Sequence, residues 1–130
     1  MEKINVLVTG NEGYIGSMVT NHLHAQGHHV TGYDNGLFRE AAFVPRTEHP
    51  HKQIYKDIRD VTPADLKNIQ AIIHLAGLSN DPLGQLDPSL TDEINHQATI
   101  NLARAAKKAG VKRFLFSSSC SMYGASNEAT

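Results

Sequence analysis

Apolar residues in this chain alternate between short continuous runs and longer segments with helical periodicity. The runs are typical of β-strands covered on both faces, and they occupy residues 3–9, 29–33, 53–56, 71–75 and 112–117. Helical spacing of apolar residues lies between them, at 13–26 and from Pro88 to Gly110. This alternation predicts an α/β fold in which helices cover both faces of a parallel sheet.

The two longer helices have recognisable ends and apolar faces. The second is predicted to start after Asp87-Pro88, a cap followed by proline at the first helical position, and Gly27 is expected to end the first. The first helix should turn four apolar side chains inward: Ile15, Met18, Val19 and Leu23. The second should do so with Leu90, Ile94, Ala98, Leu102, Ala105 and Ala109.

The remaining segments are predicted to be turns and loops. Thr62-Pro63 carries the same cap-and-proline signature and should begin a short helix that ends near Lys67. Residues 35–51 contain two prolines and no clean period, so we expect a long surface loop there. After residue 117 the chain is expected to end in a small polar tail.

Composition narrows the class of protein. The 130 residues are expected to form one domain, and 12 basic against 13 acidic residues give no indication of a nucleic-acid or membrane partner. The single cysteine, Cys120, excludes an internal disulfide and fits a reducing compartment. No apolar run approaches the ~18 residues of a membrane span. The chain opens directly into a strand, so we expect no signal peptide and a cytoplasmic location.

Three glycines at three-residue spacing, Gly10, Gly13 and Gly16, follow the first apolar run, and Asp34 comes eighteen positions after the last. Glycines at a strand-to-helix turn let backbone N–H groups approach a pyrophosphate, and the helix places its positive dipole end on that anion. A carboxylate roughly 20 residues further on can accept hydrogen bonds from the adenosine ribose. The pattern predicts a dinucleotide site.

Further motifs accompany the glycine loop. They are Asp34-Asn35, Asp57-Ile58-Arg59-Asp60, His74-Leu75-Ala76-Gly77, Asn95-x-x-x-Thr99-x-Asn101-Leu102, and the serine-rich segment 117–124 that ends in Tyr-Gly. Together they resemble the extended short-chain dehydrogenase/reductase family, best known for nucleotide-sugar epimerases and dehydratases. The resemblance covers essentially the whole chain. It implies a Rossmann-type doubly wound parallel sheet with strand order 3-2-1-4-5, and NAD as the cofactor.

The resemblance also implies roles for individual residues. Gly10, Gly13 and Gly16 would shape the pyrophosphate loop, with the amides of Tyr14 and Ile15 directed at phosphate. The other residues assigned to the cofactor are Asp34 and Asn35 beside the adenosine ribose, Asp57 and Ile58 at the adenine, Leu75, Ala76 and Gly77 at the nicotinamide-side ribose, together with Asn95 and Ser117. Asp57 would accept from the adenine amine, and Asn95 would support the active-site network. Ser119 would be the catalytic hydroxyl that orients a substrate oxygen.

Cofactor choice depends chiefly on Asp34. A carboxylate there repels a 2′-phosphate, which predicts NAD rather than NADP, and Arg39 is the nearest arginine that could oppose this. Three positions depart from the family pattern: Asn11 and Glu12 replace small residues, and Gly77 stands where many relatives have alanine. Glu12 adds negative charge near the expected pyrophosphate and would weaken its binding unless it points away.

Simpler interpretations stand beside these. Asp34 could begin an ordinary loop, Asp57 and Asp60 could form a turn before Thr62, and the serines could merely terminate a strand. His74 ends a strand within the family motif and is interpreted as structural. No cysteine or carboxylate completes a ligand set with any histidine, so no metal site is predicted.

The acid–base pair of this family, Tyr-x-x-x-Lys, is missing from the 130 residues. Four positions after the four tyrosines stand Met18, Leu37, Arg59 and Asn127. We therefore expect a cofactor-binding portion, truncated after strand five and without the catalytic and substrate-binding C-terminal part, that binds NAD without turnover. The parent enzyme would act on a nucleotide sugar.

Truncation would expose the edge of strand five and remove a neighbour of the long helix after Pro88, which predicts a homo-oligomer through either surface. A non-catalytic dinucleotide-binding sensor or interaction module is the alternative function. An NADP-dependent reductase of small carbonyls is disfavoured by Asp34.

Overall fold

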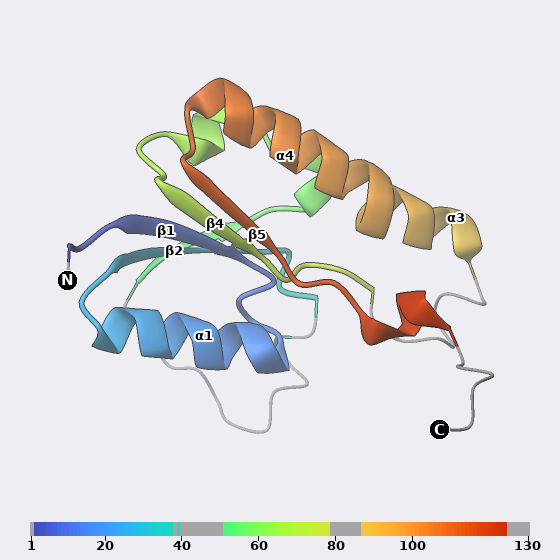
Figure 1. Cartoon of the computed structure of the whole chain (residues 1–130), viewed down its shortest axis with the longest axis horizontal. Helices are drawn as coiled ribbons and strands as arrows, with labels where there is room; N and C mark the ends of the chain where they lie inside the picture. Colours follow the sequence, from blue (N-terminus) through green and yellow to red (C-terminus); the bar gives the residue numbers. More distant parts are fainter. Residues whose placement is uncertain (1, 38, 40–50, 79–86, 125–130) are drawn as a thin grey trace.

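Five parallel strands form one sheet in the order β3-β2-β1-β4-β5 (Figure 1). They are β1 (Asn5–Thr9), β2 (His29–Asp34), β3 (Lys52–Tyr55), β4 (Ala71–His74) and β5 (Arg113–Phe116). The structure is a computed structural model that describes residues 2–37, 39, 51–78 and 87–124. The predicted fold class and strand order are confirmed, and each strand boundary falls within two residues of its predicted position.

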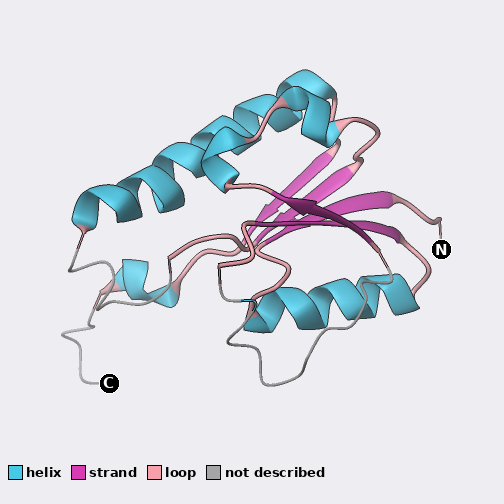
Figure 2. Cartoon of the chain, turned by 180° about the vertical axis from the view of Figure 1, so that it is seen from behind, coloured by secondary structure: helices cyan, strands magenta, loops and turns pink. Residues whose placement is uncertain are grey.

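Helices pack on both faces of the sheet (Figures 1 and 2). Helix α1 (Tyr14–Ala25) covers one face, and the long helix that precedes β5 covers the other. Alternate strand residues supply the two cores, because successive side chains point to opposite faces. Leu7 and Ile72 belong to the cluster under the long helix, whereas Val6 and Val8 belong to the cluster over α1.

The long helix consists of three consecutive segments: α3 (Pro88–Thr91), the π-helical η4 (Asp92–Gln97) and α4 (Ala98–Ala109). Its predicted apolar stripe is confirmed: Ala98, Leu102 and Ala105 are buried, and Leu90, Ile94 and Ala109 are half-buried. The π segment was not predicted. Most apolar residues of this stripe are four positions apart, so in an α-helix of 3.6 residues per turn they would shift progressively around the helix axis. The wider turn of the π-helix offsets this shift.

The predicted inward face of α1 is partly wrong. Val19 and Leu23 pack against the core, but the side chains of Ile15 and Met18 are 59% and 65% exposed. Gly16 and Thr20 are the buried residues of this helix. The reason is steric, since the glycine loop approaches the helix so closely that only a small residue fits there, and this rotates the larger side chains outward.

Short 3₁₀ turns connect the remaining elements. Asp57 caps η2 (Ile58–Asp60) by accepting from the Arg59 N–H, and Thr62 with Asp65 forms a capping box on η3 (Pro63–Leu66). Beyond β5, the predicted polar tail contains a further turn, η5 (Cys120–Tyr123). Within the predicted loop at residues 35–51, residue 38 and residues 40–50 lie outside the described residues. Among the residues described, no helix has the length and apolar character needed to cross a membrane.

We predict that Gly16→Ala destabilises the fold far more than Gly110→Ala. A Cβ at position 16 would collide with the backbone carbonyl of Gly10, whereas a Cβ at Gly110 would meet nothing within 4 Å. The first change should cost roughly 3 kcal/mol by overpacking. The second should cost about 1 kcal/mol, because Gly110 has φ +79° and only backbone strain opposes alanine. Urea denaturation measures both, and equal losses would contradict the steric argument.

Candidate cofactor site

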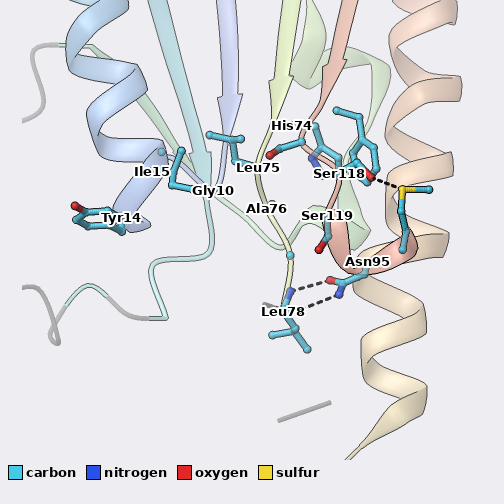
Figure 3. A pocket seen from close by; sticks show the side chains of 15 residues that line it. Gly10, Tyr14, Ile15, His74, Leu75, Ala76, Leu78, Asn95, Ser118 and Ser119 are labelled. Carbon is cyan, nitrogen blue, oxygen red and sulfur yellow. Dashed lines mark hydrogen bonds between the residues drawn. The ribbon is translucent and has the colours of Figure 1, made fainter. Parts of the chain in front are cut away.

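Two adjoining cavities open where the parallel strands end, one of about 800 Å³ and one of about 250 Å³. The larger is lined on the β5 side, and Figure 3 shows its labelled side chains. The predicted residues in its wall are Gly10, Tyr14, Ile15, Gly16, Leu75, Ala76, Gly77, Asn95, Ser117 and Ser119. Those in the wall of the smaller cavity are Gly10, Gly13, Asp34, Asn35, Asp57, Ile58, Leu75, Ala76 and Gly77. The tertiary structure thus brings all residues assigned by the resemblance to one continuous region.

The glycine loop passes over the end of β4 in close contact. Gly10 has φ +68°, its N–H donates to the Tyr33 carbonyl at 2.9 Å, and a Cβ there would lie 2.8 Å from the Ala76 nitrogen. Gly13 then caps α1 in an extended conformation. The first N–H groups of an α-helix have no acceptor within the helix. The start of α1 therefore presents donors and partial positive charge between the two cavities.

Asp34 ends β2 and has a fixed orientation. Its Oδ2 accepts from the Glu12 N–H at 3.1 Å, and its Oδ1 accepts from the Gly36 N–H at 2.9 Å. Each oxygen keeps a second lone-pair direction, since a carboxylate offers about four acceptor sites. The carboxylate is thus held by the backbone at the wall of the smaller cavity.

The two unusual residues of the glycine loop point towards β3. Asn11 is buried and pairs reciprocally with Gln53, with bonds of 2.8 and 3.1 Å. The Glu12 carboxylate accepts from the Tyr55 hydroxyl at 2.9 Å, and Glu12 is not among the residues that line either cavity. Its charge is therefore directed away from the mouth of the glycine loop.

Asp57 lines the smaller cavity, and Arg59 already holds its carboxylate. Arg59 donates from Nε to Oδ1 at 3.0 Å and from Nη2 to Oδ2 at 2.8 Å, and it also bonds Glu93 at 3.0 Å. The Arg59 hydrogen bonds lower the pKa of Asp57. Arg59 itself lines the cavity, although it was not among the predicted site residues. Its position two residues after Asp57 could have indicated an ion pair with that carboxylate.

His74 is buried at the centre of a chain of hydrogen bonds. Its Nδ1 lies 2.7 Å from the Thr9 hydroxyl and its Nε2 lies 2.8 Å from the Thr99 hydroxyl. The Thr99 hydroxyl donates to the Asn95 carbonyl, so His74 must donate from Nε2 and accept from Thr9 at Nδ1. Burial lowers the pKa of His74 to about 4. The ring is therefore neutral near pH 7, which supports the structural interpretation.

Asn95, on the π segment, clamps the loop that follows β4. Its Oδ1 accepts from the Leu78 N–H at 2.7 Å and its Nδ2 donates to the Leu78 carbonyl at 2.8 Å (Figure 3). A Cβ at Gly77 would lie 3.0 Å from this Oδ1. Glycine at position 77 therefore leaves room for the Asn95 side chain to approach the backbone closely.

The serine-rich segment leaves β5 along the larger cavity. Ser117, Ser118 and Ser119 are exposed, and the Ser118 hydroxyl contacts the Met122 sulfur at 3.3 Å. Phe116 and Met122 also line this cavity and were not predicted. Phe116 ends β5 and Met122 lies in η5, and the apolar pattern of the sequence marks neither as a cavity residue. No group of three or more potential metal ligands occurs in the part of the chain that the structure describes.

The comparisons with known proteins agree with this geometry. The family model for the NAD dependent epimerase/dehydratase family matches residues 6–130. The chain belongs to this family. It is 35% identical over 129 residues to a UDP-glucose 4-epimerase of Klebsiella pneumoniae, covering 93% of each. It is 32% identical to a UDP-glucose 4-epimerase of Rhizobium meliloti, with 95% of this chain and 38% of the relative covered.

Solved structures give the same result. A Stenotrophomonas maltophila UDP-glucose 4-epimerase with bound NAD and formylated UDP-arabinopyranose superposes on this chain with a TM-score of 0.85 at 34% identity. A UDP-N-acetylglucosamine 4-epimerase of Methanobrevibacter ruminantium superposes with a TM-score of 0.84 at 31% identity. The superposed regions include 96% and 98% of this chain but 40% and 41% of the two epimerase chains, respectively. The family is thus a family of NAD-dependent enzymes. This chain spans about two fifths of the length of its longer members.

We predict that the free energy of unfolding depends on pH through His74. The pKa falls from 6.5 to about 4 on folding, so the unfolded chain binds more protons between these values and stability is lost as pH falls through that window. The loss from this residue should reach roughly 3 kcal/mol. Denaturation at several pH values, with His74→Gln as comparison, measures it. A variant with the same pH dependence as the original chain would contradict the prediction.

Proposed function

We propose that residues 1–130 form the NAD-binding part of an epimerase or dehydratase that acts on a nucleotide sugar. The observation that carries the proposal is that all residues assigned to NAD by the resemblance line two adjoining cavities at the carboxyl edge of the sheet. In open α/β sheets this edge is where ligands bind, at the point where the strand order reverses. Here the order reverses between β1 and β4, directly under the glycine loop.

The residues fit a dinucleotide in shape and charge. The close packing of Gly10 and Gly16 keeps side chains out of the space that a pyrophosphate would occupy, and the start of α1 offers N–H donors there. Asp34 would bind the adenosine ribose in the smaller cavity, beside Ile58. The nicotinamide half would take the larger cavity, which Leu75 and Ala76 share with Ser119.

NAD supplies a hydride acceptor and donor, so that a sugar carbon can be oxidised and then reduced again. The chain's own contribution is positioning. Thr9 holds the N–H groups of Leu75 and Ala76 at 3.2 Å, and Asn95 fixes Leu78 beyond them. Ser119 would orient a substrate oxygen from the exposed rim of the larger cavity. Asp57, already bonded by Arg59, would accept from the adenine amine at a remaining lone pair.

The proposal assigns no proton transfer to these 130 residues, because no tyrosine among them is followed four positions later by lysine. The alternative function is a non-catalytic dinucleotide-binding sensor or interaction module. Either function uses the same NAD site. A reductase specific for NADP is disfavoured by the backbone-held carboxylate of Asp34.

Assembly and location are part of the proposal. β5 pairs with β4 on one side and is the last strand of the described sheet, and the side chains of Leu115 and Phe116 are 51% and 54% exposed. An open strand edge with apolar neighbours supports self-association. The helix that begins at Pro88 is the second candidate surface. A single cysteine supports a cytoplasmic location.

We predict that Asp34→Ala weakens NAD binding at least tenfold and reduces the preference over NADP. The variant loses charge-assisted hydrogen bonds to the ribose, worth roughly 1.5–3 kcal/mol each. Calorimetric titration of the chain with NAD and with NADP measures both effects. Asp60→Ala is a matched control, since Asp60 is exposed and lines neither cavity. Unchanged affinity and preference in Asp34→Ala would show that another group binds the ribose.

We also predict that residues 1–130 bind NAD but do not epimerise UDP-glucose. The expected result is no 4-epimer above background after prolonged incubation with NAD and UDP-glucose, followed by chromatography of the sugar nucleotides. A full-length UDP-glucose 4-epimerase serves as positive control. Clear turnover by the 130-residue chain would overturn the assignment of proton transfer to residues outside it.

A further inference from the structure

We propose that Thr99 is a positioning residue for the NAD site, which acts through His74 on the loop that follows β4. Thr99 lines neither cavity, and it belongs to a motif on the long helix in which the resemblance implied a role only for Asn95. The inference rests on the proposed function, because it requires NAD to bind along the loop that follows β4.

The order of protons in the network starts at a backbone carbonyl of the long helix. The Thr99 hydroxyl lies 2.8 Å from the Asn95 carbonyl oxygen, which can only accept, so the hydroxyl donates its single proton there. Thr99 Oγ1 also lies 2.8 Å from His74 Nε2, and it can then only accept from the ring. Thr99 therefore requires the imidazole proton to be on Nε2.

The described residues offer the His74 ring two polar partners, the hydroxyls of Thr99 and Thr9. The rings of Phe114 and Phe116 also lie beside the imidazole, with centroids 6.0 and 5.8 Å from its own, and they offer its nitrogens no acceptor of comparable strength. Burial lowers the pKa of His74 to about 4, so the ring carries one proton near pH 7. The two hydroxyls together decide which nitrogen carries it.

Thr9 links the tautomer to the position of the backbone. With Nδ1 unprotonated, the buried Thr9 hydroxyl donates to the ring and keeps two lone pairs for the N–H groups of Leu75 and Ala76, each at 3.2 Å. The Leu75 N–H also reaches the Thr9 carbonyl at 3.2 Å, whereas Thr9 Oγ1 is the acceptor that the structure gives to Ala76. The Ala76 N–H thus depends on the tautomer of His74.

The opposite tautomer would break this arrangement. A proton on Nδ1 would be donated to Thr9 Oγ1, and three donors would then compete for the two lone pairs of one hydroxyl. The Ala76 nitrogen lies 2.8 Å from the position of a Cβ on Gly10, so a displaced Ala76 N–H would shift the backbone against the glycine loop. Both residues line both cavities, so this shift would move the wall that the cavities share.

The first measurement is the tautomer of His74 by nitrogen NMR of the imidazole ring, at mildly alkaline pH where the other histidines are neutral as well. The signal is assigned by its loss in His74→Gln. The original chain should carry the proton on Nε2. Valine has the shape of threonine without the hydroxyl, so in Thr99→Val the proton should move to Nδ1, where Thr9 still accepts it. Thr99→Ser restores a hydroxyl and should restore the Nε2 proton.

The second measurement is calorimetric titration with NAD and with ADP, which lacks the nicotinamide-side ribose. Thr99→Val should bind NAD roughly fivefold or more weakly and ADP within about twofold of the original chain, because the loop after β4 is assigned to that ribose. Thr99→Ser should bind both ligands as the original chain does. Thr91→Val is the matched control, since the Thr91 hydroxyl also bonds a carbonyl four residues earlier, at 3.4 Å, and Thr91 lines neither cavity.

The outcomes separate the inference from the proposed function. A proton on Nδ1 in the original chain overturns the inference without any variant. Unchanged NAD affinity in Thr99→Val, equal losses for NAD and ADP, or the same weakening in Thr91→Val or Thr99→Ser also overturn it, while NAD binding by the original chain survives. An original chain that binds no NAD overturns the proposed function and the inference with it. If Thr99→Val does not fold by circular dichroism, Thr99→Ala provides the same comparison.

Discussion

A close approach between three backbone segments determines most of the site. Gly10 passes over Ala76 at the end of β4, and Gly16 faces the carbonyl of Gly10 from the first turn of α1. No side chain fits at either contact, so loop, strand and helix meet at van der Waals distance. This contact sets the rotation of α1 and the position of its N-terminus. It also leaves a shared wall between the two cavities, because Gly10 and the residues after β4 belong to both.

A second constraint ties the sheet to the long helix. The chain of hydrogen bonds runs from the N–H groups of Leu75 and Ala76 through Thr9, His74 and Thr99 to the carbonyl of Asn95. Each member donates once towards the helix, which requires a neutral imidazole with its proton on Nε2. Asn95 then returns from the helix to Leu78 with two hydrogen bonds. A buried network of this kind is stabilising only when every member is satisfied, and here the satisfied network also fixes the loop that borders the larger cavity.

Much of this protein follows from its sequence. The alternation of apolar runs and helical spacing is a local property, so it predicted all five strands and both long helices. The glycine spacing and Asp34 carry their own physical meaning, which is why the loop, its helix and the smaller cavity were expected together. The strand order came from resemblance to a family rather than from periodicity. The structure places the residues named by that resemblance around two adjoining cavities, while their roles towards NAD stay predictions.

Side-chain direction was decided by the tertiary structure alone. Periodicity placed Ile15 and Met18 inward, but steric exclusion at Gly16 turned them out, and no local pattern encodes a contact with a loop. Arg59 also bonds Glu93 on η4, and Glu12 accepts from Tyr55 on β3, so these two contacts could not be predicted from the sequence. What the sequence determined are the elements and their order along the chain, because these depend on spacing. Which way Glu12 points, and which tautomer His74 adopts, depend on neighbours that folding brings together from distant parts of the chain.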